Sequence, residues 1–98
     1  MTDPGLETFD RLIHEPARLI LMANLYVIEE ADFLYLSRQT GLTAGNISSH
    51  MAKLANAGYV EIDKGYVGRK PRTVYRLTSK GRAAFEAHKE RLVGLLEP

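Results

Sequence analysis

The feature that most constrains the fold is a very short connection between two expected helices, at residues 41–43. Gly41 supplies a stop for a helix over residues 33–40, because glycine readily takes the left-handed conformation that ends many helices. Thr43 can cap a second helix directly afterwards, and only Leu42 separates the stop from the cap. Two short helices joined by so tight a turn predict a helix-turn-helix.

The second of these helices has an apolar stripe and a polar face. Ile47, Met51 and Leu54 recur at i, i+4 and i+7, which predicts a stripe that faces the core. The opposite side carries small and polar residues, with His50 nearer the core edge, and Gly58 is expected to end the helix. Such a helix start can lie close to base edges in the major groove of DNA, which is wide enough for one α-helix.

The segments upstream predict further helices. Pro16 is suited to the first turn of a helix that runs to about Glu29 and is apolar nearly all round, which predicts burial on most sides. Asp32 is expected to cap the helix over 33–40. Its inward residues would be Phe33 and Leu36. A first helix that ends near Glu15 is predicted from the spacing of Leu6, Phe9, Leu12 and Ile13.

Two strands and a final helix are expected downstream. Residues 59–63 ("YVEID") and 73–78 ("TVYRLT") alternate and are β-branched, and residues 64–72 ("KGYVGRKPR") predict a hairpin loop with a cationic tip. Thr78 or Ser79 would cap a last helix to about Glu97. The predicted order is α-α-α-α-β-β-α, an α+β fold that is mainly α: one winged-helix domain over 1–98, with the helix-turn-helix at about 33–57, the wing at 59–78 and a C-terminal helix at 79–97.

Charge and composition exclude several classes of protein. The chain has no cysteine, so it has neither disulfides nor a thiolate metal site, as in a reducing cytoplasm. Its most apolar stretch, residues 17–28, is shorter than the roughly 20 residues of a membrane span, so a cytoplasmic protein without a membrane partner is expected. The net charge is only +1, yet seven of the thirteen basic residues lie within 64–82, which is a candidate footprint for nucleic acid.

The helix start and the basic loop together predict a DNA interface. Small polar side chains and free backbone N–H groups would contact bases and phosphates, and arginines of the wing would lie on phosphates or in the minor groove. Each piece alone is more commonly a cap, a solvated face or a turn, and only the order of the pieces favours DNA. The candidate DNA-binding residues are Thr43, Gly45, Asn46, Ser48, Ser49, His50, Lys53, Arg69, Lys70 and Arg72.

Residues 33–88 resemble the small winged helix-turn-helix transcriptional regulators related to the MarR and ArsR families. The shared motifs are "LTAGNISSHMAKL" (42–54), "GRKPRTVYRLT" (68–78) and "GRAAF" (81–85), preceded by "HEPARLIL" (14–21). The resemblance implies a homodimer that binds double-stranded DNA, expected to be a palindromic operator, and regulates transcription. Ser37 and Thr40 depart from the Ala and Leu usual in the family, and the chain ends at Pro98 without the extra helices that form a drug pocket in larger relatives. An effector of that kind is therefore not expected, and any other effector is unknown.

The two ends of the chain predict a dimer interface. Apolar residues run along the last helix beyond the length that a compact winged helix can cover, and a symmetric interface would bury them. The alternative is that the first and last helices pack on each other within one chain. The candidate interface residues are Leu6, Phe9, Ile13, Phe85, His88, Leu92, Leu95 and Leu96. If His88 is buried there, its protonation below about pH 6.5 would weaken the dimer.

Enzymatic and metal-binding functions fit the sequence poorly. His14, His50 and His88 fall at no ligand spacing, so no metal and no cofactor are expected. Adjacent Ser48, Ser49 and His50 point apart on a helix and cannot form a nucleophile–base pair. The alternative to DNA binding is a winged helix that docks another protein, because a fold alone does not determine function.

Overall fold

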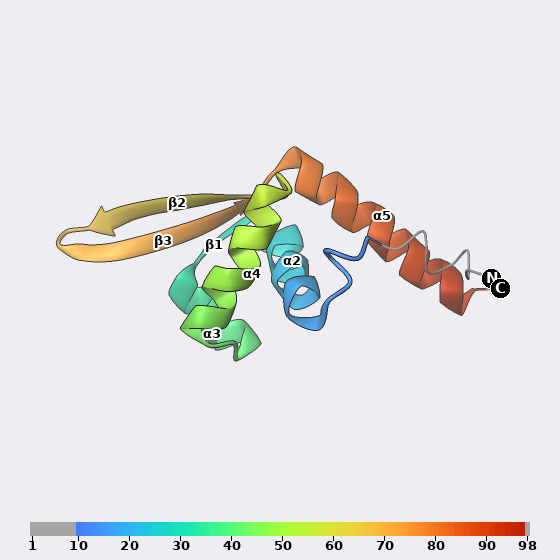
Figure 1. Ribbon diagram of the computed structural model, residues 1–98, viewed down its shortest axis with the longest axis horizontal. Helices are drawn as coiled ribbons and strands as arrows, with labels where there is room; N and C mark the ends of the chain where they lie inside the picture. Colours follow the sequence, from blue (N-terminus) through green and yellow to red (C-terminus); the bar gives the residue numbers. More distant parts are fainter. Residues whose placement is uncertain (1–9, 98) are drawn as a thin grey trace.

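A computed structural model of the chain describes residues 10–97 and shows a winged helix (Figure 1). The expected fold is confirmed in outline, with one added strand. In chain order the elements are α2 (Pro16–Ile28), β1 (Glu30–Asp32), α3 (Phe33–Thr40), α4 (Ala44–Asn56), β2 (Val60–Val67), β3 (Lys70–Leu77) and α5 (Ser79–Leu96).

The segment before α2 differs from the prediction. Leu6 and Phe9 lie outside the described residues, whereas Leu12 and Ile13 belong to a turn that precedes α2. One carboxylate oxygen of Asp10 accepts the backbone N–H groups of Leu12 and Ile13 at 2.9 and 3.3 Å. This side-chain bond to the local backbone stabilises a turn in place of a helix.

The core lies between the three helices α2, α3 and α4 and the sheet. Ile47, Met51 and Leu54 of α4 are fully buried, which confirms the predicted stripe. They pack in one cluster with apolar residues of the other elements, of which Leu21, Leu25 and Leu36 are also fully buried. Burial of such a side chain contributes about 1.5–3 kcal/mol, so this cluster holds α4 against the other helices and the sheet.

The caps expected around the helix-turn-helix are present. Asp32 accepts the backbone N–H of Tyr35 at 2.8 Å, and Thr43 accepts that of Asn46 at 3.3 Å. Gly41 ends α3 with a positive φ of 72°, a conformation that side chains with a Cβ rarely adopt. Asp32 thus stabilises the start of α3, and Gly41 and Thr43 stabilise the turn between α3 and α4.

The sheet has three antiparallel strands in the order β1-β3-β2. Strand β1 was not predicted: the sequence indicated only a helix to about Glu29 and the cap Asp32 in this segment. Glu30 is paired with Arg76 of β3, and its carboxylate accepts the guanidinium Nε–H at 2.8 Å. A cross-strand ion pair of this kind favours strand pairing in a segment whose own residues have low β propensity.

The wing is a longer ribbon than the sequence predicts. Lys64–Val67 was assigned to a loop, but β2 and β3 pair along their whole length, and only Gly68 and Arg69 lie between them. Gly68 has a φ of 62°. A glycine with this left-handed conformation permits a tight turn, so the two strands stay paired up to it and the wing is longer than predicted.

Pro71 fits the wing because of its place at an edge. The N–H of Leu77 donates to Glu29 on the β1 side of β3. Since N–H directions alternate along a strand, position 71 faces the same side. Strand β1 ends at Asp32, opposite Val74, so the missing N–H of Pro71 falls on an edge that no other strand of residues 10–97 pairs with.

Helices α2 and α5 are each buried over part of their surface. Val27 of α2 is 79% exposed, so the expected burial on most sides is only partly met. The first half of α5 packs on the body, and its second half extends away on the side opposite the wing (Figure 1), giving a molecule of 55 × 25 × 22 Å. Among residues 10–97, no helix is both long and apolar enough to cross a membrane.

Candidate nucleic-acid interface

The outer face of α4 is exposed and small. Six of the predicted contact residues, all from the cap or the outer side of this helix, lie on the surface: Thr43, Gly45, Asn46, Ser48, Ser49 and Lys53. A Cβ built on Gly45 would meet no atom within 4 Å, so nothing holds the start of the helix away from a ligand. The first turn contains no acidic residue. Its free N–H groups therefore present partial positive charge.

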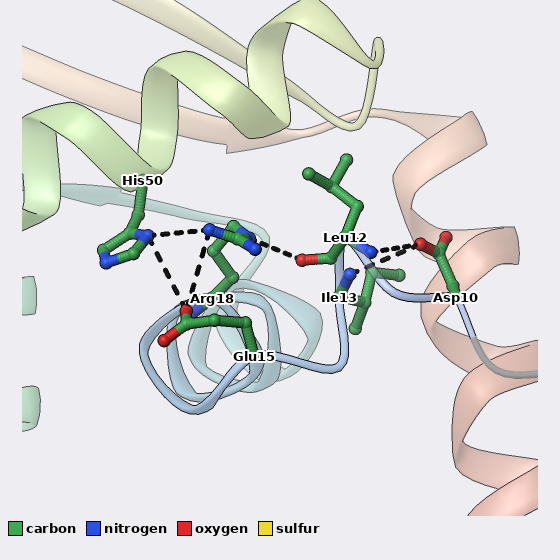
Figure 2. A network of polar contacts seen from close by, with 6 residues as sticks. All are labelled: Asp10, Leu12, Ile13, Glu15, Arg18 and His50. Atoms are coloured by element: carbon green, nitrogen blue, oxygen red, sulfur yellow. Dashed lines mark hydrogen bonds and ion pairs between the residues drawn. The ribbon is translucent and has the colours of Figure 1, made fainter. Parts of the chain in front are cut away.

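His50 differs from these six residues because it faces α2. Its side chain is 19% exposed, and its Nδ1 lies 3.1 Å from Nη1 of Arg18 and 3.6 Å from Oε2 of Glu15 (Figure 2). The sequence prediction placed His50 among the DNA contacts. The structure places one side of its ring in a polar network inside the protein.

Arg18 and Glu15 were not predicted as site residues. Glu15 is the N-cap of α2, and its carboxylate accepts the backbone N–H of Arg18 at 2.9 Å. That hydrogen bond, with smaller contributions from the backbone N–H of Ala17 and the charge of Arg18, lowers the pKa of the Glu15 carboxyl. A charged Arg18 inside an otherwise apolar helix was the available signal, because a buried guanidinium requires partners.

The cations of residues 64–82 fall into two groups. Arg76 pairs with Glu30 and Glu61, Arg82 pairs with Glu29, and Arg72 pairs with Asp32. By contrast, no ion pair within residues 10–97 involves the other four cations, which are Lys64, Arg69 and Lys70 of the wing and its turn, and Lys80 at the start of α5. The positive charge available to a ligand is therefore concentrated at the wing.

Arg72 joins the wing to the start of α3. Its Nη2 donates to Oδ2 of Asp32 at 3.3 Å, and its side chain remains 52% exposed. The pKa of the Asp32 carboxyl is lowered, chiefly by the backbone N–H of Tyr35 and then by Arg72. Of the three wing residues predicted to bind DNA, Arg72 is thus partly neutralised, whereas Arg69 and Lys70 are not.

An open cleft lies between the wing and α3. It has a volume of about 360 Å³, within the range of small ligand sites. Its walls are mostly apolar, with cations at the β3 side, and the lining residues are Asp32, Phe33, Leu34, Val67, Lys70, Pro71, Arg72 and Thr73.

The predicted dimer residues divide into buried and exposed sets. Ile13, Phe85 and His88 are buried within a single chain, so the protomer already covers them, and their assignment to an interface stays a prediction. Leu92 is half-buried, whereas Leu95 and Leu96 are 64% and 83% exposed.

The turn at residues 10–15 contacts several elements. The second carboxylate oxygen of Asp10 accepts the hydroxyl of Tyr59 at 2.6 Å, and this bond, with burial, raises the pKa of Tyr59 to about 12. Nδ1 of His14 lies 3.2 Å from Nε2 of His88 on α5. No group of three metal-binding side chains occurs in the part of the chain that the structure describes.

Comparisons with known proteins agree with the geometry. The sequence profile of the family described as "Winged helix DNA-binding domain" matches residues 17–96. An uncharacterised protein of Methanocaldococcus jannaschii is 34% identical over 76 residues, which are 78% of this chain and 83% of the relative.

Solved structures of regulators are also similar. A transcriptional regulator homologue from Pyrococcus horikoshii OT3 matches with a TM-score of 0.88 and 27% identity, over 97% of this chain and 96% of that one. The transcriptional repressor BigR from Xylella fastidiosa matches with a TM-score of 0.65 and 26% identity, over 90% and 82% of the two chains. The expected likeness to winged-helix regulators is confirmed.

Proposed function

This chain belongs to the family of winged helix DNA-binding domains, and on that premise we propose that it regulates transcription as a homodimer bound to a palindromic operator. The family is one of DNA-binding proteins and not of enzymes. The observation that best supports the finer proposal is the pairing of two surfaces: the small polar face of α4 and the wing cations that form no ion pair within residues 10–97.

Each surface has a distinct task in the proposed complex. The start of α4 enters the major groove, where Asn46 and Ser49 hydrogen-bond base edges or phosphates. Arg69 and Lys70 contact the backbone beside it or the adjacent minor groove. Since short polar side chains make few paired contacts to a base, phosphate contacts and DNA shape supply much of the affinity. Each neutralised phosphate steepens the dependence of log K on log salt by about 0.9.

The end of α5 supports the dimer. Val93, Leu95 and Leu96 are exposed on the part of α5 that extends beyond the body. Packing of this end against a second copy would bury these side chains, and two-fold symmetry would present two α4 helices about 34 Å apart, one turn of DNA. We expect analytical ultracentrifugation to give a dimer for the wild type and a monomer after Leu95→Glu and Leu96→Glu together.

Selection from a random pool of double-stranded DNA tests DNA binding. The wild type is expected to enrich a palindrome whose half-sites lie about one helical turn apart. A variant with Ser49, Lys53, Arg69 and Lys70 changed to alanine should lose this enrichment, because it lacks proposed contacts from both α4 and the wing.

A charge-matched control distinguishes the loss of specific contacts from a general effect of lower net charge. Arg11, Lys89 and Arg91 are exposed and lie outside α4 and the wing. Their joint change to alanine removes the same three positive charges and should leave the enriched sequence unchanged. Equal loss of enrichment in both variants would show that only net charge matters and would contradict the assigned interface.

A winged helix that docks a protein is the alternative function, and the apolar cleft beside α3 favours it. Leu34 and Val67, both exposed, contribute to its walls. No DNA enrichment by the wild type, together with its persistence as a folded dimer, would favour this alternative.

A further inference from the structure

A polar network joins the largely buried guanidinium of Arg18 to helix α4. The Arg18 side chain is only 12% exposed. Its Nε donates to the carbonyl of Leu12, and its Nη1 lies 3.1 Å from Nδ1 of His50 and 3.8 Å from Oε2 of Glu15 (Figure 2). One guanidinium thus contacts the N-terminal turn, the cap of α2 and the middle of α4.

The chemistry of these groups determines where the His50 proton lies. A guanidinium has N–H donors, no acceptor, and does not lose its proton in proteins. Nδ1 of His50 must therefore accept the hydrogen bond from Arg18 with its lone pair. In a neutral imidazole the proton then lies on the other nitrogen, Nε2.

Glu15 competes for the same nitrogen but is placed less well. A carboxylate favours a proton on Nδ1, yet Oε2 lies 3.6 Å away, beyond normal hydrogen-bond length. The same oxygen already accepts the backbone N–H of Arg18 at 2.9 Å. The negative charge of Glu15 instead balances the guanidinium. Arg18 therefore keeps an ionic partner while its Nη1–H donates to His50.

We propose that Arg18 is a positioning residue for DNA binding: it holds His50 in the tautomer with the proton on Nε2, so that α4 presents an N–H donor to a phosphate or base acceptor. This inference rests on the proposed function. Figure 2 shows the second ring nitrogen of His50 directed away from Arg18 and Glu15. The opposite tautomer would present a lone pair there, which repels a phosphate oxygen.

Nitrogen-15 NMR of the imidazole rings tests the tautomer without any DNA. At about pH 8.5, where an ordinary imidazole is neutral, the wild type should show His50 protonated on Nε2. Arg18→Met removes the donors while keeping an apolar stem, and should shift His50 toward a mixture of tautomers. Arg18→Lys restores a donor and should return the signal toward the wild-type pattern, whereas Arg11→Met, at an exposed arginine in the turn before α2, should have no effect.

A pair of amide substitutions tests the donor on DNA. Glutamine places its amide N–H near the position of Nε2, whereas asparagine places it near Nδ1. On the enriched operator, His50→Gln should bind within about threefold of the wild type and His50→Asn about tenfold more weakly, since a hydrogen bond to a charged group contributes on that order. Circular dichroism should show both variants folded.

Several results would overturn the inference. A wild-type His50 protonated on Nδ1, or a tautomer unchanged by Arg18→Met, would show that Arg18 does not determine the tautomer of His50. Equal affinities of the His50→Gln and His50→Asn variants would show that DNA binding does not use an N–H donor at the position of Nε2. If the wild type enriches no DNA, the proposed function and the donor role both fail, while NMR still decides the tautomer independently.

Discussion

In the helical body Leu36, Ile47 and Leu54 are fully buried, whereas in the outer half of the wing Tyr66 and Val67 are 75% and 61% exposed. The body is held by a shared apolar core. Within residues 10–97 the outer wing is held mainly by the hydrogen bonds of a two-stranded ribbon and its turn, and the Arg72–Asp32 pair links it to the start of α3. An isolated ribbon of that kind is marginally stable by itself, so the wing depends on the body for its form and is available for contact with a ligand.

The largest expected effect separates the two regions directly. Leu36→Ala should lower the free energy of unfolding by about 2–5 kcal/mol, because it leaves a cavity in the core. Val67→Ala should change it by no more than about 0.5 kcal/mol, since the side chain is mostly exposed. Urea unfolding followed by circular dichroism measures both, and similar losses would show that the wing contributes to the core.

A pair of glycines sharpens the comparison at the junction between the wing and α5. A Cβ on Gly81 would collide with the carbonyl of Tyr59 and contact Leu77, whereas one on Gly65 would meet nothing within 4 Å. Gly81→Ala should therefore destabilise the protein by about 1–3 kcal/mol, and Gly65→Ala by no more than about 0.5 kcal/mol. Thermal unfolding of the two variants side by side checks this, and a neutral Gly81→Ala would mean that α5 shifts freely on the sheet.

Asp32 connects the two regions, since it caps α3 and also pairs with Arg72 of the wing. Asp32→Ala should cost about 1 kcal/mol, mainly through the lost cap. Arg72→Ala should cost less than about 0.5 kcal/mol, because a half-exposed ion pair contributes little. Denaturant midpoints distinguish the two. A larger loss for Arg72→Ala would show that the pair, and not the cap, is the stabilising contact.

The smallest effect concerns pH and is confined to the body, because β2 and β3 contain no histidine. Burial, and then the charges of His14 and Arg91, lower the pKa of His88, while Asp10 opposes them. The unfolded chain therefore takes up the proton first as pH falls below about 6.5, and stability decreases from that pH toward the lower folded-state pKa. Urea midpoints at about pH 7.5 and about pH 5.5 should show this decrease, reduced in His88→Gln. The difference between the two midpoints should not depend on protein concentration if the effect lies within one protomer.

Local signals were sufficient to predict the helix-turn-helix. Asp32, Gly41 and Thr43 act through bonds to their own neighbours, and the spacing of Ile47, Met51 and Leu54 reports one face of one helix. The structure confirms all of them. The DNA contacts assigned to α4 and the wing remain predictions, although the exposure of those side chains is consistent with them.

Features that depend on distant partners could not be predicted in the same way. Strand β1 pairs through Glu30 and Arg76, which are far apart in the sequence, and β3 accommodates Pro71 only because that edge is free. The burial of Ile13, Phe85 and His88 within one chain could not be predicted either, because a helical stripe does not reveal whether its own chain covers it. The partners of Arg18 were missed for the same reason.

The place of Pro71 also bears on how these molecules behave at high concentration. A projecting ribbon with a bare edge is a template to which the edge of another molecule can add, and such pairing leads to aggregation. A missing N–H interrupts the ladder of hydrogen bonds that this addition requires. Pro71 therefore discourages the addition of another molecule to this edge of β3, next to the exposed cations of the wing.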